Sequence, residues 1–208
     1  PCLTARVAGE GLSAYSTGRK RAPLNGRSPC NKRTNTMNYR NVIIEKIACV
    51  LPPEVVTSEA LEQRLKALYD RLHLPFGRLE LMTGIRERRF WPKGTRPSQA
   101  SAEAGRKAME QAGVAPSSID CLLHCSVSRD YVEPATSTAV HRHLQLPSRA
   151  INLDLSNACL GVLSGMVMMG NMIELGQIER GLIVAGESAR PLVETTINRL
   201  NRDPELTR

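Results

Sequence analysis

Cys159 stands at a junction where a thiol could act as a nucleophile. Residues 151–155 before it form a short apolar run that predicts a buried strand, and the apolar segment that follows, to about Leu175, is long enough for a helix. A thiol at the start of a helix lies near unpaired backbone N–H groups and the positive end of the helix dipole, which favour the thiolate. The same N–H groups can stabilise an oxyanion. The alternative is that Cys159 is a small buried hydrophobic residue.

Glu133 is a second candidate, in residues 128–136 (S-R-D-Y-V-E-P-A-T). This segment follows another apolar run, residues 121–127, that predicts a strand. Pro134 suits the first turn of a helix that reaches about Leu144, so Glu133 is expected near the N-cap. A carboxylate at that position can stabilise the helix dipole without any further role.

Three stretches of the chain resemble thiolase-superfamily condensing enzymes of the β-ketoacyl synthase III type. Residues 157–161 (N-A-C-L-G) resemble their nucleophile turn, and residues 83–89 (T-G-I-R-E-R-R) resemble a signature near their start. Residues 128–136 resemble the branch that condenses two acyl-CoA chains head to head (the OleA-type branch). The match runs from about Tyr39 to the last residue.

This resemblance implies an acyltransferase that makes a β-ketoacyl thioester by Claisen condensation, in fatty-acid or lipid metabolism. Cys159 would carry the acyl-enzyme. Glu133 would reach across a homodimer interface as the base that deprotonates the second acyl chain, which requires a carboxylate in a dry pocket where its pKa rises. Asp130 is the local alternative. The substrates would be acyl-CoA or acyl carrier protein thioesters, with no further cofactor.

Two other functions stay open beside this one. The first is the classical initiation synthase, which uses malonyl-acyl carrier protein and releases carbon dioxide. That branch carries a Trp and an Arg shortly before the T-G pair, which clamp the coenzyme A substrate. Arg78 and Met82 stand there instead, so neither the usual stacking on the adenine ring nor the usual short acyl primer is implied. The second is a non-catalytic half-domain that pairs with a complete homologue.

The resemblance also implies the fold class: α/β, the first half of a thiolase-type αβαβα layered domain, over residues 39–208. In the family a second half supplies a His and an Asn that complete the site. All four histidines of this chain precede Cys159 and match no such motif. We therefore expect a fragment that lacks the second half and exposes a large apolar face.

Composition separates the first 38 residues from the rest of the 208-residue chain. They hold seven Lys or Arg and one Glu, whereas the remainder holds 21 basic and 19 acidic residues, so most of the net charge of +8 lies in the first segment. This segment shows no apolar period and predicts a disordered basic tail or a non-native leader ahead of Met37. A transit peptide or a nucleic-acid-binding arm is a weaker alternative. The balanced remainder does not suggest a nucleic-acid surface.

The six cysteines include no C-x-x-C pair. Cys121 and Cys125 are four residues apart on a predicted strand, about 13 Å, which is too far for one metal. His141 and His143 do not share a helix face. We expect neither a metal site nor a disulfide framework, and a reducing cytoplasm fits best. No apolar run is long enough to span a membrane.

The other elements follow from apolar spacing. Residues 41–51 and 181–188 predict strands, and residues 98–113 predict a helix with Gly113 as its C-cap. A leucine stripe at positions 61, 65, 68 and 72 predicts one helix that begins at Thr57 or Ser58. The residues after 188 are expected to be a surface connection. Glycines at positions 161, 165 and 170 indicate close packing or room for an acyl tunnel, and at least half of the four methionines between 166 and 172 are expected to fill the core.

Overall fold

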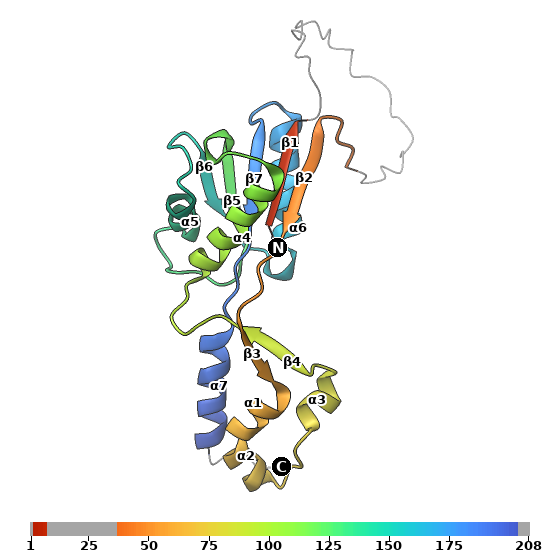
Figure 1. The fold of residues 1–208 in the computed structure, drawn as a ribbon, viewed down its shortest axis with the longest axis vertical. Helices are drawn as coiled ribbons and strands as arrows, with labels where there is room; N and C mark the ends of the chain where they lie inside the picture. Colours follow the sequence, from red (N-terminus) through yellow and green to blue (C-terminus); the bar gives the residue numbers. More distant parts are fainter. Residues whose placement is uncertain (1, 8–36, 204–208) are drawn as a thin grey trace, which may run out of the picture.

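A five-stranded sheet organises the larger part of the molecule, which we call the sheet lobe (Figure 1). The computed structural model describes residues 2–7 and 37–203, with side chains for the second range. In spatial order, the strands are β2 (Val42–Ala48), β1 (Cys2–Val7), β7 (Arg180–Val184), β5 (Cys121–His124) and β6 (Ile151–Asp154). β5 pairs in parallel with both β6 and β7, whereas β1 runs antiparallel to β7 and β2.

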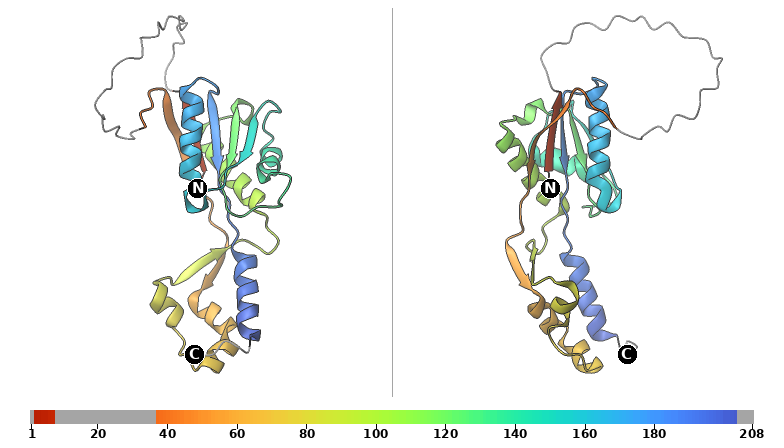
Figure 2. Two further views of the ribbon diagram at one scale, coloured as in Figure 1. Left: turned by 180° about the vertical axis from the view of Figure 1, so that it is seen from behind. Right: turned by 90° about the vertical axis from the view of Figure 1, so that its right-hand side faces the viewer.

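Two parallel crossovers place helices on opposite faces of this sheet. Helix α5 (Thr136–Leu144) connects β5 to the edge strand β6, and α6 (Gly161–Glu174) connects β6 back past β5 to β7. Because both crossovers are right-handed by rule and run in opposite directions, they must cover different faces. Figure 2 shows α6 on one face, and α5 on the other beside α4 (Pro97–Ala112).

Apolar side chains fill both sides of the sheet. On the side of α4 and α5, a buried cluster includes Leu122, Val140, Leu182 and Val184. On the side of α6, a second cluster forms around Leu123, Met169 and Ile183. β5 is buried at all four positions, as expected of a strand covered on both faces.

A small lobe extends from the sheet lobe, and the chain crosses between them after β2, after β4 and after β7 (Figure 1). It contains the antiparallel pair β3 (Glu54–Thr57) and β4 (Glu87–Phe90). Four helices complete it: α1 (Ser58–Arg64), α2 (Lys66–Leu72), α3 (Arg78–Thr83) and α7 (Arg190–Arg202). Short 3₁₀ turns, η1 (Pro116–Ser118) and η2 (Ala158–Leu160), lie in the sheet lobe.

Polar contacts connect the elements of the small lobe. The carboxylate of Glu62, which is 1% exposed, accepts hydrogen bonds from the backbone N–H of Gly77 and Leu79 and from the hydroxyl of Tyr69. At the opposite end, the Arg190 guanidinium pairs with Glu54 and donates to the backbone oxygen of Trp91. The lobe is therefore held by a buried carboxylate at one end and a partly exposed ion pair at the other.

The α/β class and most elements of the sheet lobe agree with the sequence. Strands lie within the predicted ranges at β2, β5 and β6, and β7 begins one residue before its predicted range. Helices α4 and α6 lie where apolar spacing put them. Gly113 caps α4 in the left-handed conformation, as predicted.

Three predictions are wrong. The residues after 188 form α7, because Pro191 at the first turn starts a helix and Arg71 of α2 donates to its last carbonyls, at Leu200 and Asn201. The leucine stripe forms two helices that meet at Leu65. The helix after Pro134 begins only at Thr136, with Ala135 as N-cap.

The first residues also differ from the predicted tail. Residues 2–7 form β1 between β2 and β7, where backbone pairing on both sides satisfies the N–H and C=O groups of the strand. Residues 8–36 of the predicted tail or leader lie outside the described residues.

Candidate active site

The carboxyl ends of the parallel strands β5, β6 and β7 meet at one edge of the sheet, and both predicted site residues lie beyond it. Glu133 follows β5, and Cys159 follows β6. In open α/β sheets, this edge is where ligands bind.

Cys159 lies in the 3₁₀ turn η2, two residues before α6 begins. Ala158 before it has φ 44°, a left-handed conformation that residues with a Cβ seldom adopt. The side-chain amide of Asn157 donates to Ser164 Oγ of α6 at 2.8 Å, and Leu160 N donates to Asn157 O at 2.9 Å. The turn is therefore held both to the helix and within itself. Cys159 is exposed there. A strained turn that presents a reachable thiol at a helix start is an arrangement typical of a nucleophile.

Two glycines allow the start of α6 to pack directly on the end of β5. A Cβ added to Gly161 would lie 3.1 Å from Cys125 O, and one added to Gly165 would lie 2.7 Å from Cys125 Sγ. The prediction of close packing is confirmed at these two positions. This contact fixes the start of α6, directly after the turn that carries Cys159.

The two buried cysteines of the sheet lobe, Cys121 and Cys125, are unsuited to nucleophilic chemistry. Burial raises the pKa of Cys121 to about 11 and that of Cys125 to about 12, with smaller contributions from Asp120 to the first and from Asp154 to the second. A thiol of so high a pKa is almost entirely protonated near neutral pH.

The loop that carries Glu133 is held at both ends. At its start, the carboxylate of Glu187 accepts from Val127 N and Ser128 N, at 2.7 and 3.0 Å. At its end, the carboxylate of Asp154 accepts from Thr136 N and Ser137 N, at 2.8 and 2.7 Å.

Asp130 fastens the middle of the same loop to α4. Its carboxylate accepts from the backbone N–H and the hydroxyl of Ser98, and its own N–H donates to Thr136 Oγ1. Asp130, the alternative to Glu133 as the base, is therefore already hydrogen-bonded to the starts of α4 and α5. Arg96 lies over the Tyr131 ring at 5.1 Å and adds a further contact.

Glu133 itself stands at the exposed tip of this loop, beside Val132, which is 86% exposed. Within residues 37–203, no hydrogen bond or ion pair joins Glu133 to another side chain or to Cys159. The structure thus places both predicted residues beyond the same sheet edge without bringing them into contact.

Sequence reasoning missed three side chains that shape this edge, His124, Asp154 and Glu187, and it considered Asp130 only as an alternative base. One signal was available. In β6 the sequence I-N-L-D alternates polar and apolar, and Asn152 and Asp154 point toward α5, where they bond its first residues. The hydrogen bond from Ser128 N to Glu187 joins two loops that lie 59 residues apart, and no comparable pattern in the sequence indicates it.

Known proteins share this arrangement of chain and fold. The chain is 42% identical over 170 residues to an acyl-CoA:acyl-CoA alkyltransferase of Shewanella oneidensis, covering 82% of this chain and 49% of that protein. A β-ketoacyl-[acyl-carrier-protein] synthase III of Symbiobacterium thermophilum is 32% identical over 157 residues, with 76% and 45% covered. The crystal structure of Xanthomonas campestris OleA with cerulenin superposes with a TM-score of 0.77 at 35% identity, with 82% and 51% covered. No protein-family model matches.

The chain belongs to the thiolase-superfamily condensing enzymes, near the OleA branch. It spans about half the length of the curated relatives that it matches. The thiolase-type fold expected from the resemblance is confirmed for this half.

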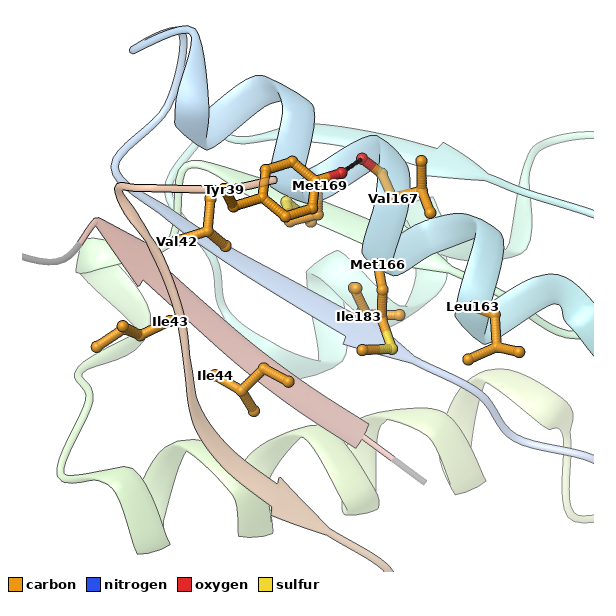
Figure 3. Close-up of a pocket in the computed structure, with 9 residues that line it drawn as sticks. All are labelled: Tyr39, Val42, Ile43, Ile44, Leu163, Met166, Val167, Met169 and Ile183. Carbon is orange, nitrogen blue, oxygen red and sulfur yellow. Dashed lines mark hydrogen bonds between the residues drawn. The ribbon is translucent and has the colours of Figure 1, made fainter. Parts of the chain in front are cut away.

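An apolar cavity of about 340 Å³ lies between β2 and α6 of this OleA-like half (Figure 3). Ile43 and Ile44 line it from β2, and Leu163 and Met166 line it from α6, with Leu163 four residues beyond Cys159. The Tyr39 hydroxyl donates to Val167 O at 3.2 Å across one end (Figure 3). Met169 also lines the cavity and is fully buried, and Met168 and Met172 pack partly buried against the same core cluster, as predicted for at least half of the methionines.

Two arginines of the T-G-I-R-E-R-R stretch make polar contacts in the small lobe. Arg88 donates to Ser58 Oγ at 3.1 Å, and Arg89 donates to Pro52 O at 3.3 Å. No ion pair in residues 37–203 involves either of them or Arg86.

Among the described residues, no group of three or more His, Cys, Asp or Glu side chains could hold a metal ion. None of the helices in that part of the chain combines the length and the apolar character that crossing a bilayer requires.

Proposed function

We propose that the protein containing this chain is an acyltransferase that joins two long acyl-CoA chains by Claisen condensation. The observation that carries this proposal is Cys159, exposed in a left-handed turn at the start of α6, beyond the carboxyl edge of the sheet. The buried cysteines nearby cannot take this role, because burial keeps them protonated.

The chemistry begins with the Cys159 thiolate, which attacks the carbonyl carbon of an acyl thioester. Backbone N–H groups at the start of α6 hold the oxyanion that forms, and the coenzyme A thiolate leaves. The Glu133 carboxylate then removes a proton from the α-carbon of a second acyl thioester. The carbanion attacks the acyl-enzyme carbonyl, the Cys159 thiolate leaves, and a β-ketoacyl thioester is released.

In this mechanism Glu133 serves the active site of a second copy in a homodimer. Two features support that arrangement. The tip that carries Glu133 is exposed while its two ends are anchored, so the carboxylate can be presented rigidly to another chain. Among the described residues, the edge strand β6 pairs with β5 alone, and its Ile151 and Leu153 are 44% and 41% exposed. Such an edge pairs readily with another strand.

The cavity between β2 and α6 is proposed to hold part of an acyl chain. It is apolar, and it begins one helical turn from the nucleophile. We also propose a cytoplasmic location, which fits the four free cysteines at positions 49, 121, 125 and 159.

Covalent labelling tests the role of the nucleophile. On incubation with a long-chain acyl-CoA, the chain should gain one acyl group by intact mass, and Cys159→Ala should abolish this gain. Cys49→Ala is the matched control, because Cys49 is also an exposed thiol. Iodoacetamide should likewise modify Cys159 faster than Cys49 below the pH at which a free thiol ionises. Equal reactivity of the two thiols would favour a non-catalytic half-domain.

Glu133→Gln tests the identity of the base. In a condensation assay of the protein that contains this chain, the variant should lose roughly 10²- to 10⁴-fold in condensation rate, the usual contribution of a general base. Acylation of Cys159 should be unchanged. Unchanged condensation, together with carbon dioxide release from a malonyl thioester, would favour the decarboxylative synthase instead.

A further inference from the structure

His124, the last residue of β5, is buried below the proposed active edge without a hydrogen bond. It is 1% exposed, and neither ring nitrogen has a hydrogen-bond partner in the described part of the chain. Asp154 Oδ1 lies 3.4 Å from its Nδ1. A buried polar group left unpaired is costly, so its presence in an otherwise apolar strand needs a reason.

Asp154 connects this ring to the loop that carries Glu133. The same oxygen, Oδ1, accepts from Ser137 N at 2.7 Å, and Oδ2 accepts from Thr136 N at 2.8 Å. A carboxylate oxygen can accept two hydrogen bonds, so Oδ1 can serve Ser137 and His124 together. His124, Asp154 and the first residues of α5 are therefore one connected unit.

We propose that His124 is a positioning residue, whose Nδ1–H holds the Asp154 carboxylate against the start of α5 and thereby fixes the loop that carries Glu133. The ring does not touch substrate in this role. It acts on proton abstraction only through the position of the Glu133 loop, so the consequence for catalysis rests on the proposed function.

The surroundings favour the neutral ring that this role requires. Burial lowers the pKa of His124, and although Asp154, Glu187 and Asp130 oppose this effect, the pKa stays below its usual value. A neutral imidazole carries one proton, and the proposal requires that proton on Nδ1.

The tautomer can be measured in the native sequence. In ¹⁵N-labelled protein, long-range ¹H–¹⁵N spectra distinguish a protonated Nδ1 from a protonated Nε2. We expect Nδ1–H for His124 near neutral pH. A protonated Nε2 with a bare Nδ1 would overturn the proposal, because the ring would then have nothing to donate to Asp154.

Three substitutions separate positioning from packing. The amide nitrogen of Asn stands the same number of bonds from Cα as Nδ1, whereas that of Gln matches Nε2, and Leu has no donor. Hydrogen exchange at Thr136 and Ser137 should therefore rise about tenfold in His124→Gln and His124→Leu, the loss of one hydrogen bond to a charged group, and change little in His124→Asn. A role in packing alone predicts the reverse, because Asn is the smallest of the three, and that order would overturn the proposal.

The exchange measurement is independent of turnover, so failure of the proposed function remains distinguishable. If the expected order of exchange appears while no condensation is found, His124 positions the loop and the proposed function is wrong. In a protein that does condense acyl-CoA, condensation should fall in His124→Gln and His124→Leu more than in His124→Asn. Cys159 acylation should stay the same in all three.

Discussion

The two lobes are stabilised by different kinds of burial. In the sheet lobe, most of the large, fully buried side chains are apolar, and Leu122, Leu182 and Val184 are all 0% exposed. In the small lobe, the best-buried residues are Ser58 and Glu62, each at 1%, whereas its buried apolar side chains remain 6–8% exposed. The sheet lobe has a core of hydrocarbon, and the small lobe closes around a carboxylate.

This difference follows from what each lobe must hold. The sheet lobe presents Cys159 and the anchored Glu133 loop, and a site of that kind needs a rigid support. The small lobe carries neither residue. Its elements are short, and they are joined by directional bonds such as those from Gly77 and Leu79 to Glu62. Because such bonds depend on charge, the small lobe should respond to loss of charge far more than the sheet lobe does.

Glu62→Gln should produce the largest change. A Gln amide nitrogen cannot accept from the N–H groups of Gly77 and Leu79, now 2.6 Å from the carboxylate oxygens, so a buried donor would face another donor. We expect a loss of about 3 kcal/mol, confined to the small lobe. Amide hydrogen exchange, read separately in the two lobes, measures this loss.

Two matched variants calibrate that effect. Tyr69→Phe removes only one of the bonds to Glu62 and should cost about 1 kcal/mol. Asp70→Asn breaks the exposed pair with Lys66 and should cost about 0.3 kcal/mol. An equal loss of protection in both lobes after Glu62→Gln would show that they unfold as one unit.

The same contrast explains which parts of the fold could be predicted from sequence. Apolar periodicity located β5, β7 and α6, because burial of hydrocarbon is what organises them. It missed β3, β4, α3 and α7, whose positions depend on hydrogen bonds between residues far apart in sequence, such as that from Arg190 to Trp91 O.

The candidate site divides in the same way. Cys159 was identifiable because strand, turn and helix follow one another directly in the sequence. The anchors at Asp154, Asp130 and Glu187 were missed because each depends on which strand or helix lies beside it. A single sequence does not give that information, although the polar positions in I-N-L-D pointed to one of them.

Gly165→Ala should have a smaller effect, located in the sheet lobe. The added Cβ would meet Cys125 Sγ at 2.7 Å, and overpacking of this kind costs about 2 kcal/mol. Cys125→Ala removes that sulfur, so the double variant should recover at least about 1 kcal/mol relative to the sum of the single changes. Equilibrium unfolding of the four proteins measures this coupling.

Gly170→Ala in the same helix is the control. There the new Cβ meets the end of the Tyr39 ring, which can move, and Ala gains helix propensity over Gly. Additive losses for Gly165→Ala and Cys125→Ala would mean that α6 does not depend on this close contact with β5.

Lowering the pH should destabilise the two lobes at different pH values. This effect should be the smallest, since a single titrating group acts in each lobe, His124 in one and Glu62 in the other. Burial lowers the pKa of His124 below 6.5, against the opposing carboxylates of Asp154, Glu187 and Asp130. The unfolded chain therefore binds a proton first, and stability of the sheet lobe should fall as the pH drops below about 6.5. His124→Asn cannot titrate and should remove this dependence.

In the small lobe, burial of Glu62 raises its pKa, but the bonds from Leu79, Gly77 and Tyr69 outweigh this effect and hold the pKa below its usual 4.5. Stability from this group is therefore present above pH 4.5 and is lost as the pH falls through the lower value of the folded state. On acidification, amides of the sheet lobe should lose protection first and those of the small lobe only below pH 4.5. Simultaneous loss in both lobes, or the reverse order, would contradict the assignment of separate charged groups to the two lobes, because only a shared titrating group or fully coupled unfolding produces a single transition.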